Sequence, residues 1–430
     1  MACGGEPPVA RNVILISVDT LRADHLGCYG YDRPTSPYID AMAREGLLFE
    51  DASSTSPWTL PAHASLLVGR YPAHHGVRAI GRVLPPDLPT LASLLRVQGF
   101  TTGAVVNLLA LQQTHRLLSG FESTELIGSD QSAAGAAERV TQAAMDWLEA
   151  HREGRSFLFV HYYDVHSDYR SLPEHERLFT RRTSDFQGST RQIIAITVQG
   201  KVPADAEDLP LLYDAGIRQI DRELGRLFGW LEERGWLEDT LVVFTSDHGE
   251  EFFDHGPDPR GETSGVSHGH SLFQELVRVP LILRGPSIPR QVRVTEPVSL
   301  VDVVPTVLGS LGLAAPSELD GVDLRPLFES RPFGGERYLY FETSRSLRTP
   351  NLEGVRRGRY KLVTDLAAGE HRLYDLSRDP GESADLSDEL PEVVRQLLAD
   401  LEHARAERLE AEERELSDPE RERLKALGYL

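Results

Sequence analysis

Two apolar runs that end in metal-ligand residues constrain this chain most. Residues 12–18 are followed by Asp19, and residues 241–246 are followed by Asp247 and His248. Near-continuous apolar runs of this length are typical of parallel strands that are buried on both faces. In α/β proteins, the carboxyl ends of such strands form the edge that holds the functional site. The sequence therefore predicts an α/β fold in which these two strand ends supply ligands to one site.

Strand and helix patterns alternate along most of the remaining chain. Further strands are predicted at 47–52, 101–106, from 157 and at 277–284, and helices at 37–46, 88–99, 132–150 and 209–233. This alternation favours a mainly parallel sheet sandwiched by helices. Residues 171–208 are polar and weakly patterned, and we expect a lid, a substrate-recognition insert or a disordered segment there.

A hydroxyl stands at a predicted helix start within residues 56–72. Thr59 lies two positions before Pro61, and proline is favoured in the first turn of a helix. The free N–H groups and the dipole of a helix N-terminus favour an anion, so this hydroxyl is placed to attack an anionic ester. The alternative is an ordinary N-cap, since threonine is a good one. Together with the strand ends, the pattern suggests a metal ion held by Asp19, Thr59, Asp247 and His248.

The same stretch resembles the signature of the sulfatase branch of the alkaline phosphatase superfamily. Thr59-x-Pro61-x-His63, followed by residues 66–72, is similar to the family's Cys-x-Pro-x-Arg motif and its Leu-Thr-Gly-Arg-Tyr-Pro continuation. The resemblance continues in order at 246–250, 278–282, 319–324 and 373–382. It implies an alkaline-phosphatase/sulfatase-like fold and an enzyme that hydrolyses ester bonds.

Several departures from the family pattern bear on the chemistry. Family sulfatases convert the Cys or Ser of the motif to formylglycine, and Thr59 cannot be converted in that way. The usual Arg is His63, and the second residue of the family's N-terminal Asp-Asp pair is Thr20. Asn107 stands where a Lys and a His are expected after the strand at 101–106. The resemblance therefore predicts a sulfatase fold with altered chemistry.

Histidines supply most of the remaining candidate site residues. His166 matches by position a family His that contacts the ester oxyanion, and a capped strand-end loop is the structural alternative. His268 and His270 lie in a Gly-rich loop near the point where many members carry a Lys that binds the ester oxygens. We expect His63, His166, His268 and His270 to act in catalysis. We expect Asn107, His166, His268 and His270 to bind the substrate.

A second metal ion is a further hypothesis. Asp164, His166 and His268 resemble the second-site ligands of two-metal members of the superfamily. Two cations would clamp the attacking and leaving oxygens together. The spacing between Asp164 and His166 is tighter than in those families, however, and a His166 that binds only the substrate explains that residue as well.

The expected reaction is an in-line displacement at phosphorus with Thr59 as the nucleophile. Metal coordination lowers the pKa of a hydroxyl, and the helix N-terminus stabilises the charge that develops. The product is a phospho-Thr59 enzyme that water hydrolyses, and a phosphodiester, a monoester or a phosphonate would serve as substrate. The mixed oxygen and nitrogen ligand set favours Zn²⁺ or Mn²⁺ over the harder Ca²⁺ or Mg²⁺.

Three other functions compete with this one. A sulfuric ester hydrolase could work without formylglycine, and a transferase could move the phospho-group to a glycan or lipid hydroxyl. A non-catalytic protein could keep the fold for binding alone. The intact Asp19, Asp247 and His248 count against that last interpretation.

Composition and the ends of the chain limit partners and location. A net charge of -21 over 430 residues argues against non-specific binding of nucleic acid, so a small anionic ester must be drawn in by the metal and by local cations. The start of the chain, with Cys3 among small residues, resembles a mature bacterial lipoprotein, which would tether the protein to a membrane in the periplasm or outside the cytoplasm. A flexible N-terminus with a chance cysteine is the alternative. The sequence does not indicate an oligomeric state.

We divide the chain into three parts. Residues 1–11 form a flexible N-terminus, 12–327 the catalytic domain, and 328–430 a C-terminal α+β subdomain. The subdomain is expected to hold a small antiparallel sheet and a helix from Pro391. Residues 402–425 are rich in charge, which predicts a solvated helix at the C-terminus.

Overall fold

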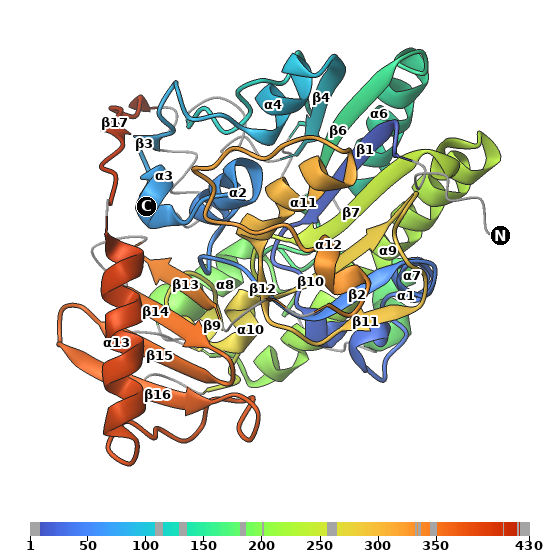
Figure 1. The fold of residues 1–430 in the computed structure, drawn as a ribbon. Coiled ribbons are helices and arrows are strands. Elements are labelled where there is room, and N and C mark those ends of the chain that lie inside the picture. The colour runs from blue at the N-terminus through green and yellow to red at the C-terminus, as the bar shows by residue number, and fades with distance from the viewer. Residues whose placement is uncertain are drawn as a thin grey trace.

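A large sheet dominates the computed structural model, which describes residues 9–107, 115–128, 136–180, 186–199, 202–255, 265–331, 333, 337–344, 351–406, 408–418 and 421. In these residues the sheet has nine strands in the order β11-β2-β10-β7-β1-β6-β4-β5, with β12 also paired to β2 (Figure 1). Its strands are β1 Asn12–Val18, β2 Leu47–Ser53, β4 Phe100–Val106, β5 Ser123–Leu126, β6 Arg155–Tyr162, β7 Thr240–Ser246, β10 Arg278–Arg284, β11 Val292–Val294 and β12 Val298–Ser299.

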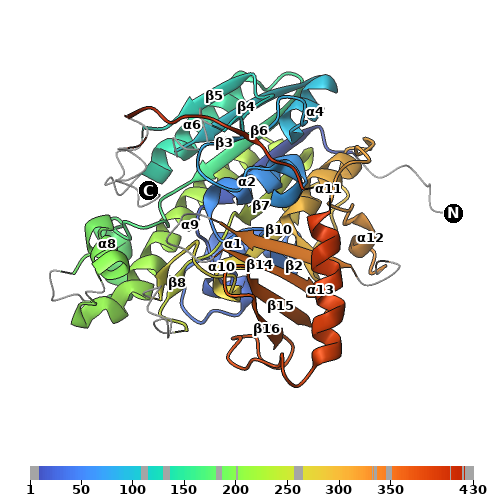
Figure 2. The ribbon, with the colours of Figure 1, turned by 90° about the vertical axis from the view of Figure 1, so that its left-hand side faces the viewer.

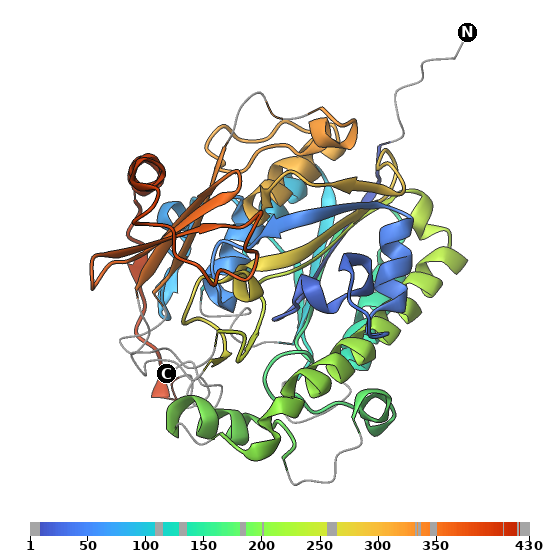
Figure 3. The same cartoon turned by 90° about the horizontal axis from the view of Figure 1, so that it is seen from below.

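The centre of this sheet is parallel and lies between two helical layers. Strand β1 pairs in parallel with both β6 and β7, and β10 runs antiparallel to β7. Side chains of β1 alternate between two cores: Val13 and Leu15 pack on one face, and Ile14 and Ile16 on the other. The first face is covered by α2 Thr59–Val68, α4 Leu91–Val97 and α11 Val303–Ser310, and the second by α1 Pro37–Arg44, α6 Ala136–Ala150 and α9 Leu209–Glu233, the long yellow-green helix in Figure 3.

A smaller antiparallel sheet lies beside the large one. Its strands pair in sequence order: β13 Tyr338–Thr343, β14 Leu352–Arg357, β15 Tyr360–Asp365 and β16 Glu370–Asp375. Helix α13, Pro391–Arg405, packs across this sheet and buries Leu397 and Leu401 against it (Figure 2). The expected fold class, a mainly parallel sheet between helices with a smaller C-terminal α+β part, is thus confirmed. The boundary between residues 327 and 328 stays a prediction.

Short elements connect these layers. They are the helices α3 Pro72–His75, α7 Pro173–Phe179, α8 Thr190–Gln199, α10 Gln274–Val277 and α12 Arg325–Phe328, the 3-10 helices at Ala23–His25, Gly27–Tyr29, Ala204–Asp208, Trp236–Glu238 and Leu300–Asp302, and the strands β3 Arg82–Val83, β8 Glu251–Phe252, β9 Val266–Ser267 and β17 Glu412–Glu413. In the described ranges, no helix combines the length and the apolar character that a membrane span requires. Cys3 lies outside the described residues.

The predicted helix at 402–425 is wrong for residues 406 and 408–417, which are not helical, while residues 419–420 and 422–425 lie outside the described residues. Helix α13 ends at Arg405, and β17 pairs antiparallel with β3, which lies more than 300 residues earlier in the chain. The amide of Leu409 donates to the carbonyl of Ala73, and Ala411 is buried. The high charge of this segment suggested a solvated helix. Composition cannot reveal that the backbone of the segment forms hydrogen bonds with a distant part of the chain.

Residues 171–208, which are weakly patterned in the sequence, form regular elements where the structure describes them. This segment contains α7 and α8 and ends in a 3-10 helix. Ile193 and Ile196 of α8 are buried, three positions apart on one helical face. Two apolar positions in a short polar segment give too weak a period to identify a helix from the sequence.

Candidate active site

Three ligand-type side chains meet where β1 and β7 end. The two strands pair in parallel with Val18 opposite Ser246, so the residues that follow them emerge at neighbouring points of the sheet edge. Asp19, Asp247 and His248 are buried and offer one ligand atom each, all within 4.8 Å of one another. In the described part of the chain this is the only group of three or more such side chains.

The tautomer of His248 suits a metal ligand. Its Nδ1 lies 2.8 Å from the carbonyl oxygen of Gly249, which can only accept, so Nδ1 carries the proton. The neutral ring therefore keeps a lone pair on Nε2. That atom lies 3.3 Å from Asp247 Oδ2 and 3.7 Å from Asp19 Oδ1.

One oxygen of each carboxylate is left for a cation. Asp19 Oδ1 and Asp247 Oδ2 are buried and accept no hydrogen bond from any described residue. Their partner oxygens are satisfied, because Asp19 Oδ2 lies 3.2 Å from His161 Nε2 and Asp247 Oδ1 accepts from the amides of Thr20 and His248. Burying a carboxylate oxygen without a partner is costly. The donor set thus fits a divalent cation.

The charges of the site lead to the same conclusion. Burial, and next the Glu250 carboxylate, raises the pKa of Asp19, while burial and the Asp19 carboxylate raise that of Asp247. Burial lowers the pKa of His248, and it lowers the pKa of His161 to about 3. These neutral imidazoles provide no counter-charge for the carboxylates, and a bound cation would provide it.

Thr59 joins this group from helix α2. The helix begins at Thr59, and Trp58 occupies the N-cap position, so Thr59 is not the N-cap that the sequence left as an alternative. Its Oγ1 lies 3.3 Å from His248 Nε2. The whole of α2 is buried, which fixes this hydroxyl against the core.

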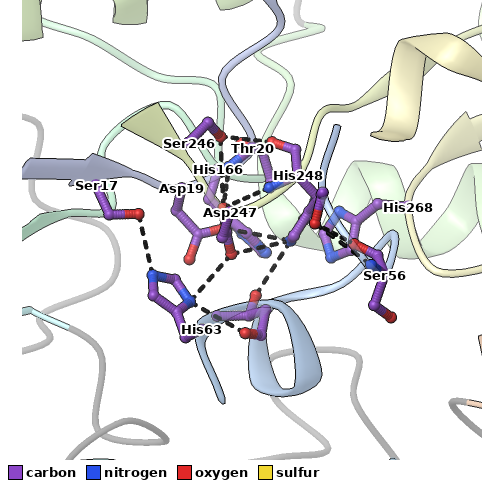
Figure 4. A network of polar contacts seen from close by, with 12 residues as sticks. Ser17, Asp19, Thr20, Ser56, His63, His166, Ser246, Asp247, His248 and His268 are labelled. Carbon is purple, nitrogen blue, oxygen red and sulfur yellow. Dashed lines mark hydrogen bonds and ion pairs between the residues drawn. The ribbon is translucent and has the colours of Figure 1, made fainter. Parts of the chain in front are cut away.

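His63 lies one turn along the same helix and bridges three elements. Its Nδ1 is 3.0 Å from the carbonyl oxygen of Thr59 and 3.3 Å from Asp247 Oδ2, while its Nε2 is 3.1 Å from Ser17 Oγ (Figure 4). Burial, and next the neighbouring His161, hold the pKa of His63 well below its usual value. His63 therefore positions its neighbours as a neutral ring and lacks the charge of the arginine in the family motif.

His166 and His268 lie beside Asp19, Asp247 and His248, which we call the metal-type ligands. The ring centroids of His268 and His248 are 4.5 Å apart, and those of His166 and His268 are 4.9 Å apart. His268 Nδ1 lies 2.9 Å from Glu250 Oε1, and His166 Nδ1 lies 2.9 Å from Ser167 Oγ. Figure 4 shows His268 on the side of His248 away from Ser17. The assignment of both histidines to the substrate stays a prediction.

The residues of the proposed second metal site do not form a ligand group. The Asp164 carboxylate accepts from the amide of Ala137, at the start of α6, and from the side chain of Gln219. Asp164, His166 and His268 do not converge as a ligand set among the described residues. Asp164 instead binds helix α6, a role that its position beside His166 in the sequence does not reveal.

The remaining substrate-binding candidates are less central. Asn107 directly follows β4, and its Nδ2 lies 3.4 Å from Asp164 Oδ2 while its Oδ1 is buried without a described partner. His270 Nε2 contacts Glu251 Oε2 and makes no described contact with the Asp19 or Asp247 carboxylate. Both assignments stay predictions.

Two residues of the site were missed in the sequence. His161 lies beside Ser17 in the β1–β6 register and bonds Asp19, and Glu250 bonds His268. His161 interrupts an apolar strand close to its carboxyl end, which was an available signal. Glu250 follows Asp247-His248-Gly249 directly, but only the β8–β9 hairpin places it opposite His268.

Comparison with known proteins assigns most of the chain to two family models. The Sulfatase model matches residues 11–313. The model for the C-terminal part of N-sulphoglucosamine sulphohydrolase matches residues 265–407. Steryl-sulfatase of Mus musculus is 28% identical, with 92% of this chain and 82% of the relative covered. Arylsulfatase A of Homo sapiens is 26% identical, with 90% and 87% covered.

Solved structures share the fold at lower identity. The phosphonate monoester hydrolase of Agrobacterium radiobacter superposes with a TM-score of 0.75 at 23% identity, covering 94% of this chain and 96% of that one. A second structure, titled BT4656 in complex with its substrate D-glucosamine-2-N,6-O-disulfate, also has a TM-score of 0.75, at 19% identity and with 93% and 97% covered. The expected sulfatase-like architecture is confirmed.

Proposed function

Since this chain belongs to the sulfatase family and is a hydrolase that acts on ester bonds, we propose that it cleaves phosphate esters with Thr59 as the nucleophile. The observation that carries the proposal is the hydroxyl of Thr59 at the start of α2, 3.3 Å from His248 Nε2. The substrate class includes phosphodiesters, phosphate monoesters and phosphonates.

Asp19, Asp247 and His248 would hold one divalent cation, with Thr59 Oγ1 as a further ligand. When bound, the cation supplies Lewis acidity that lowers the pKa of the Thr59 hydroxyl and offsets the charge of the ester. The set of two carboxylates, an imidazole and a hydroxyl favours Zn²⁺ or Mn²⁺.

The side chains then have separate roles. The Thr59 Oγ–P bond forms as the bond from phosphorus to the leaving oxygen breaks, and the free N–H groups at the start of α2 stabilise the negative charge. His166 and His268 are placed to bind the ester oxygens and to protonate the leaving group. Water next hydrolyses the phosphorus ester on Thr59, which restores the hydroxyl and releases phosphate from a monoester, a phosphate monoester from a diester, or a phosphonate from a phosphonate ester.

Comparisons support two substrate classes. Structural neighbours named as phosphonate monoester hydrolases favour chemistry at phosphorus. The curated relatives named as sulfatases favour a sulfate ester as the second candidate. Thr59 favours phosphorus, because the family resemblance links sulfate hydrolysis to a formylglycine that threonine cannot form.

A panel of aryl phosphate monoesters, diesters, phosphonates and sulfates, assayed with Zn²⁺- or Mn²⁺-loaded protein, tests the proposal. Thr59→Ala should lose about 10³-fold or more in kcat while it stays folded and metal-loaded, and Thr59→Ser should keep part of the activity. Thr102→Ala is the matched control, because Thr102 is also buried but donates to the carbonyl oxygen of Gly120.

Mass spectrometry after rapid acid quench should detect phosphate on the peptide that contains Thr59. Wild-type rates in Thr59→Ala would refute the nucleophile. Turnover of sulfates alone would establish the second candidate instead.

A further inference from the structure

The segment that carries His268 and His270 has little regular structure of its own. We call residues 266–272 the histidine loop. Its pairing with β8 is limited to Glu251 opposite Ser267 and Phe252 opposite Val266. Ser267 has a φ of 83° and Gly269 a φ of 84°, both in the left-handed region that is unfavourable for serine. A non-glycine residue persists there only when surrounding contacts hold it.

Those contacts come from the C-terminal sheet. Thr343, the last residue of β13, is fully buried and donates from Oγ1 to the carbonyl oxygen of Gly269 at 2.9 Å. Gly269 lies between His268 and His270. This carbonyl belongs to the peptide unit between Gly269 and His270, so the hydrogen bond restrains the backbone directly before His270 and one residue after His268.

A second contact holds the end of the loop. Lys361 of β15 is fully buried, donates from Nζ to the carbonyl oxygen of Leu272, and pairs with Glu382 at 2.8 Å. Glu382 in turn accepts from the amide of Gln274 at 2.6 Å. The Leu272 side chain packs in a cluster with Phe341 of β13. Backbone and side chain of the loop end are both fixed to the small sheet.

The end of β13 also contacts the segment that leads to Thr59. The amide of Glu342 donates to the carbonyl oxygen of Thr55 at 3.0 Å, and Thr55 Oγ1 donates to Ser65 Oγ of α2. Consecutive residues of one strand therefore bond the nucleophile segment and the histidine loop. This arrangement sets the distance between two parts of the site that are far apart in the sequence.

We propose that Thr343 and Lys361 are positioning residues that hold the histidine loop in its substrate-facing conformation. The C-terminal sheet is thereby part of the substrate-binding apparatus, although its side chains do not supply the metal ligands. The inference rests on the proposed function for the role of His268 and His270, while the positioning itself follows from the described contacts.

Thr343→Val tests the first contact, because valine keeps the shape and removes the donor. Thr343→Ser keeps the hydroxyl and is the conservative rescue. Lys361→Met combined with Glu382→Gln removes the second contact without leaving a buried carboxylate unpaired. Asp51→Asn is the matched control: Asp51 joins the same sheet to β2 through Arg356 and does not contact the histidine loop.

Three measurements are made on metal-loaded protein: hydrogen exchange of the peptide covering 266–276, the Kd for inorganic phosphate, and metal content. Thr343→Val and the double variant should speed exchange in this peptide and weaken phosphate binding about 10- to 100-fold at unchanged metal content. Thr343→Ser and Asp51→Asn should match the wild type.

Unchanged exchange and phosphate Kd in Thr343→Val would overturn the inference whatever the nucleophile is. If Thr59→Ala keeps its activity but Thr343→Val alters the loop as expected, the nucleophile assignment fails and the positioning role stands. If Asp51→Asn changed exchange and phosphate binding as much as Thr343→Val does, the contacts of Thr343 would only stabilise the fold in general. That result would also overturn the inference.

Discussion

The metal-type ligands and the histidine loop reach one site by different means. Asp19 and Asp247 follow adjacent strands whose register is set by backbone hydrogen bonds, with Val18 opposite Ser246. The histidine loop begins with the two-residue strand β9, and side chains from the C-terminal sheet bond its backbone. Sites built on strands are held more tightly than sites built on loops. We therefore expect metal binding to tolerate changes in the C-terminal sheet and the substrate-binding histidines to respond to them.

The largest effect is expected when a strand-end ligand is removed. Asp247→Ala and His248→Ala should lose the metal and lower kcat/KM about 10³-fold or more, because both the cation and its charge compensation are gone. Metal analysis and the ester panel measure this. His270→Gln, on the loop side, should keep its metal. Full metal occupancy in both Asp247→Ala and His248→Ala would refute the metal site. Loss of the metal in His270→Gln would show that metal binding also depends on the histidine loop.

The second-largest effect is expected when the packing between the histidine loop and the small sheet is disrupted. Leu272→Ala removes a side chain that is 1% exposed, in the cluster that joins the loop end to β13. Truncating a buried leucine costs about 2–5 kcal/mol of unfolding free energy. Denaturant unfolding measures the loss, and metal affinity of the folded variant should stay at the wild-type value. A fall in metal affinity as large as that of Asp247→Ala would show that the metal ligands depend on the packing of the histidine loop, against the comparison.

A smaller effect is expected at the partner of Asp19. His161→Phe removes the imidazole that bonds Asp19 Oδ2 at 3.2 Å and keeps an aromatic ring in the buried strand. Loss of a hydrogen bond to a ligating carboxylate typically costs about 10- to 100-fold in metal affinity. Calorimetric titration with Zn²⁺ measures it. Wild-type affinity would mean that strand register alone positions Asp19.

The smallest effect concerns His74, which ties α3 to the C-terminal segment. Its Nδ1 lies 2.8 Å from Asp320 Oδ2 and its Nε2 lies 3.0 Å from the carbonyl oxygen of Ala406, so the protonated ring donates at both ends. The hydrogen bond to Asp320 raises the pKa of His74 above 6.5.

Because the folded-state pKa is raised, this stabilisation is fully present below the unfolded value of 6.5 and is lost as pH rises through the folded value. His74→Gln should cost about 0.5–1 kcal/mol at pH 5.5, since the pair is partly solvated, and less at pH 8.5. Unfolding curves at the two pH values measure this difference. If His74→Gln lowered the unfolding free energy equally at both pH values, the protonated form of His74 would not be the stabilising one.

Much of the fold could be predicted because its signals are local. The apolar runs at β1 and β7 mark buried strands, and the regular apolar spacing of α9 marks a helix against the sheet. Strand ends of a parallel sheet meet at one edge, and that rule was sufficient to group Asp19 with Asp247 and His248. The partners of these ligands were harder to find. Glu250 reaches His268 only through a hairpin, and His161 reaches Asp19 only through the pairing of β6 with β1.

The sequence by itself determined the class of fold, the family and the side chains that can bind a cation, because each depends on periodicity or on motifs within a few residues of one another. Tertiary structure alone decided that Asp164 bonds the start of α6, that the segment after α13 pairs with β3, and that Thr343 and Lys361 donate to the backbone of the histidine loop. These contacts join residues far apart in the chain. Their energy depends on whether a buried donor or acceptor finds a partner after packing, and no local pattern records that outcome.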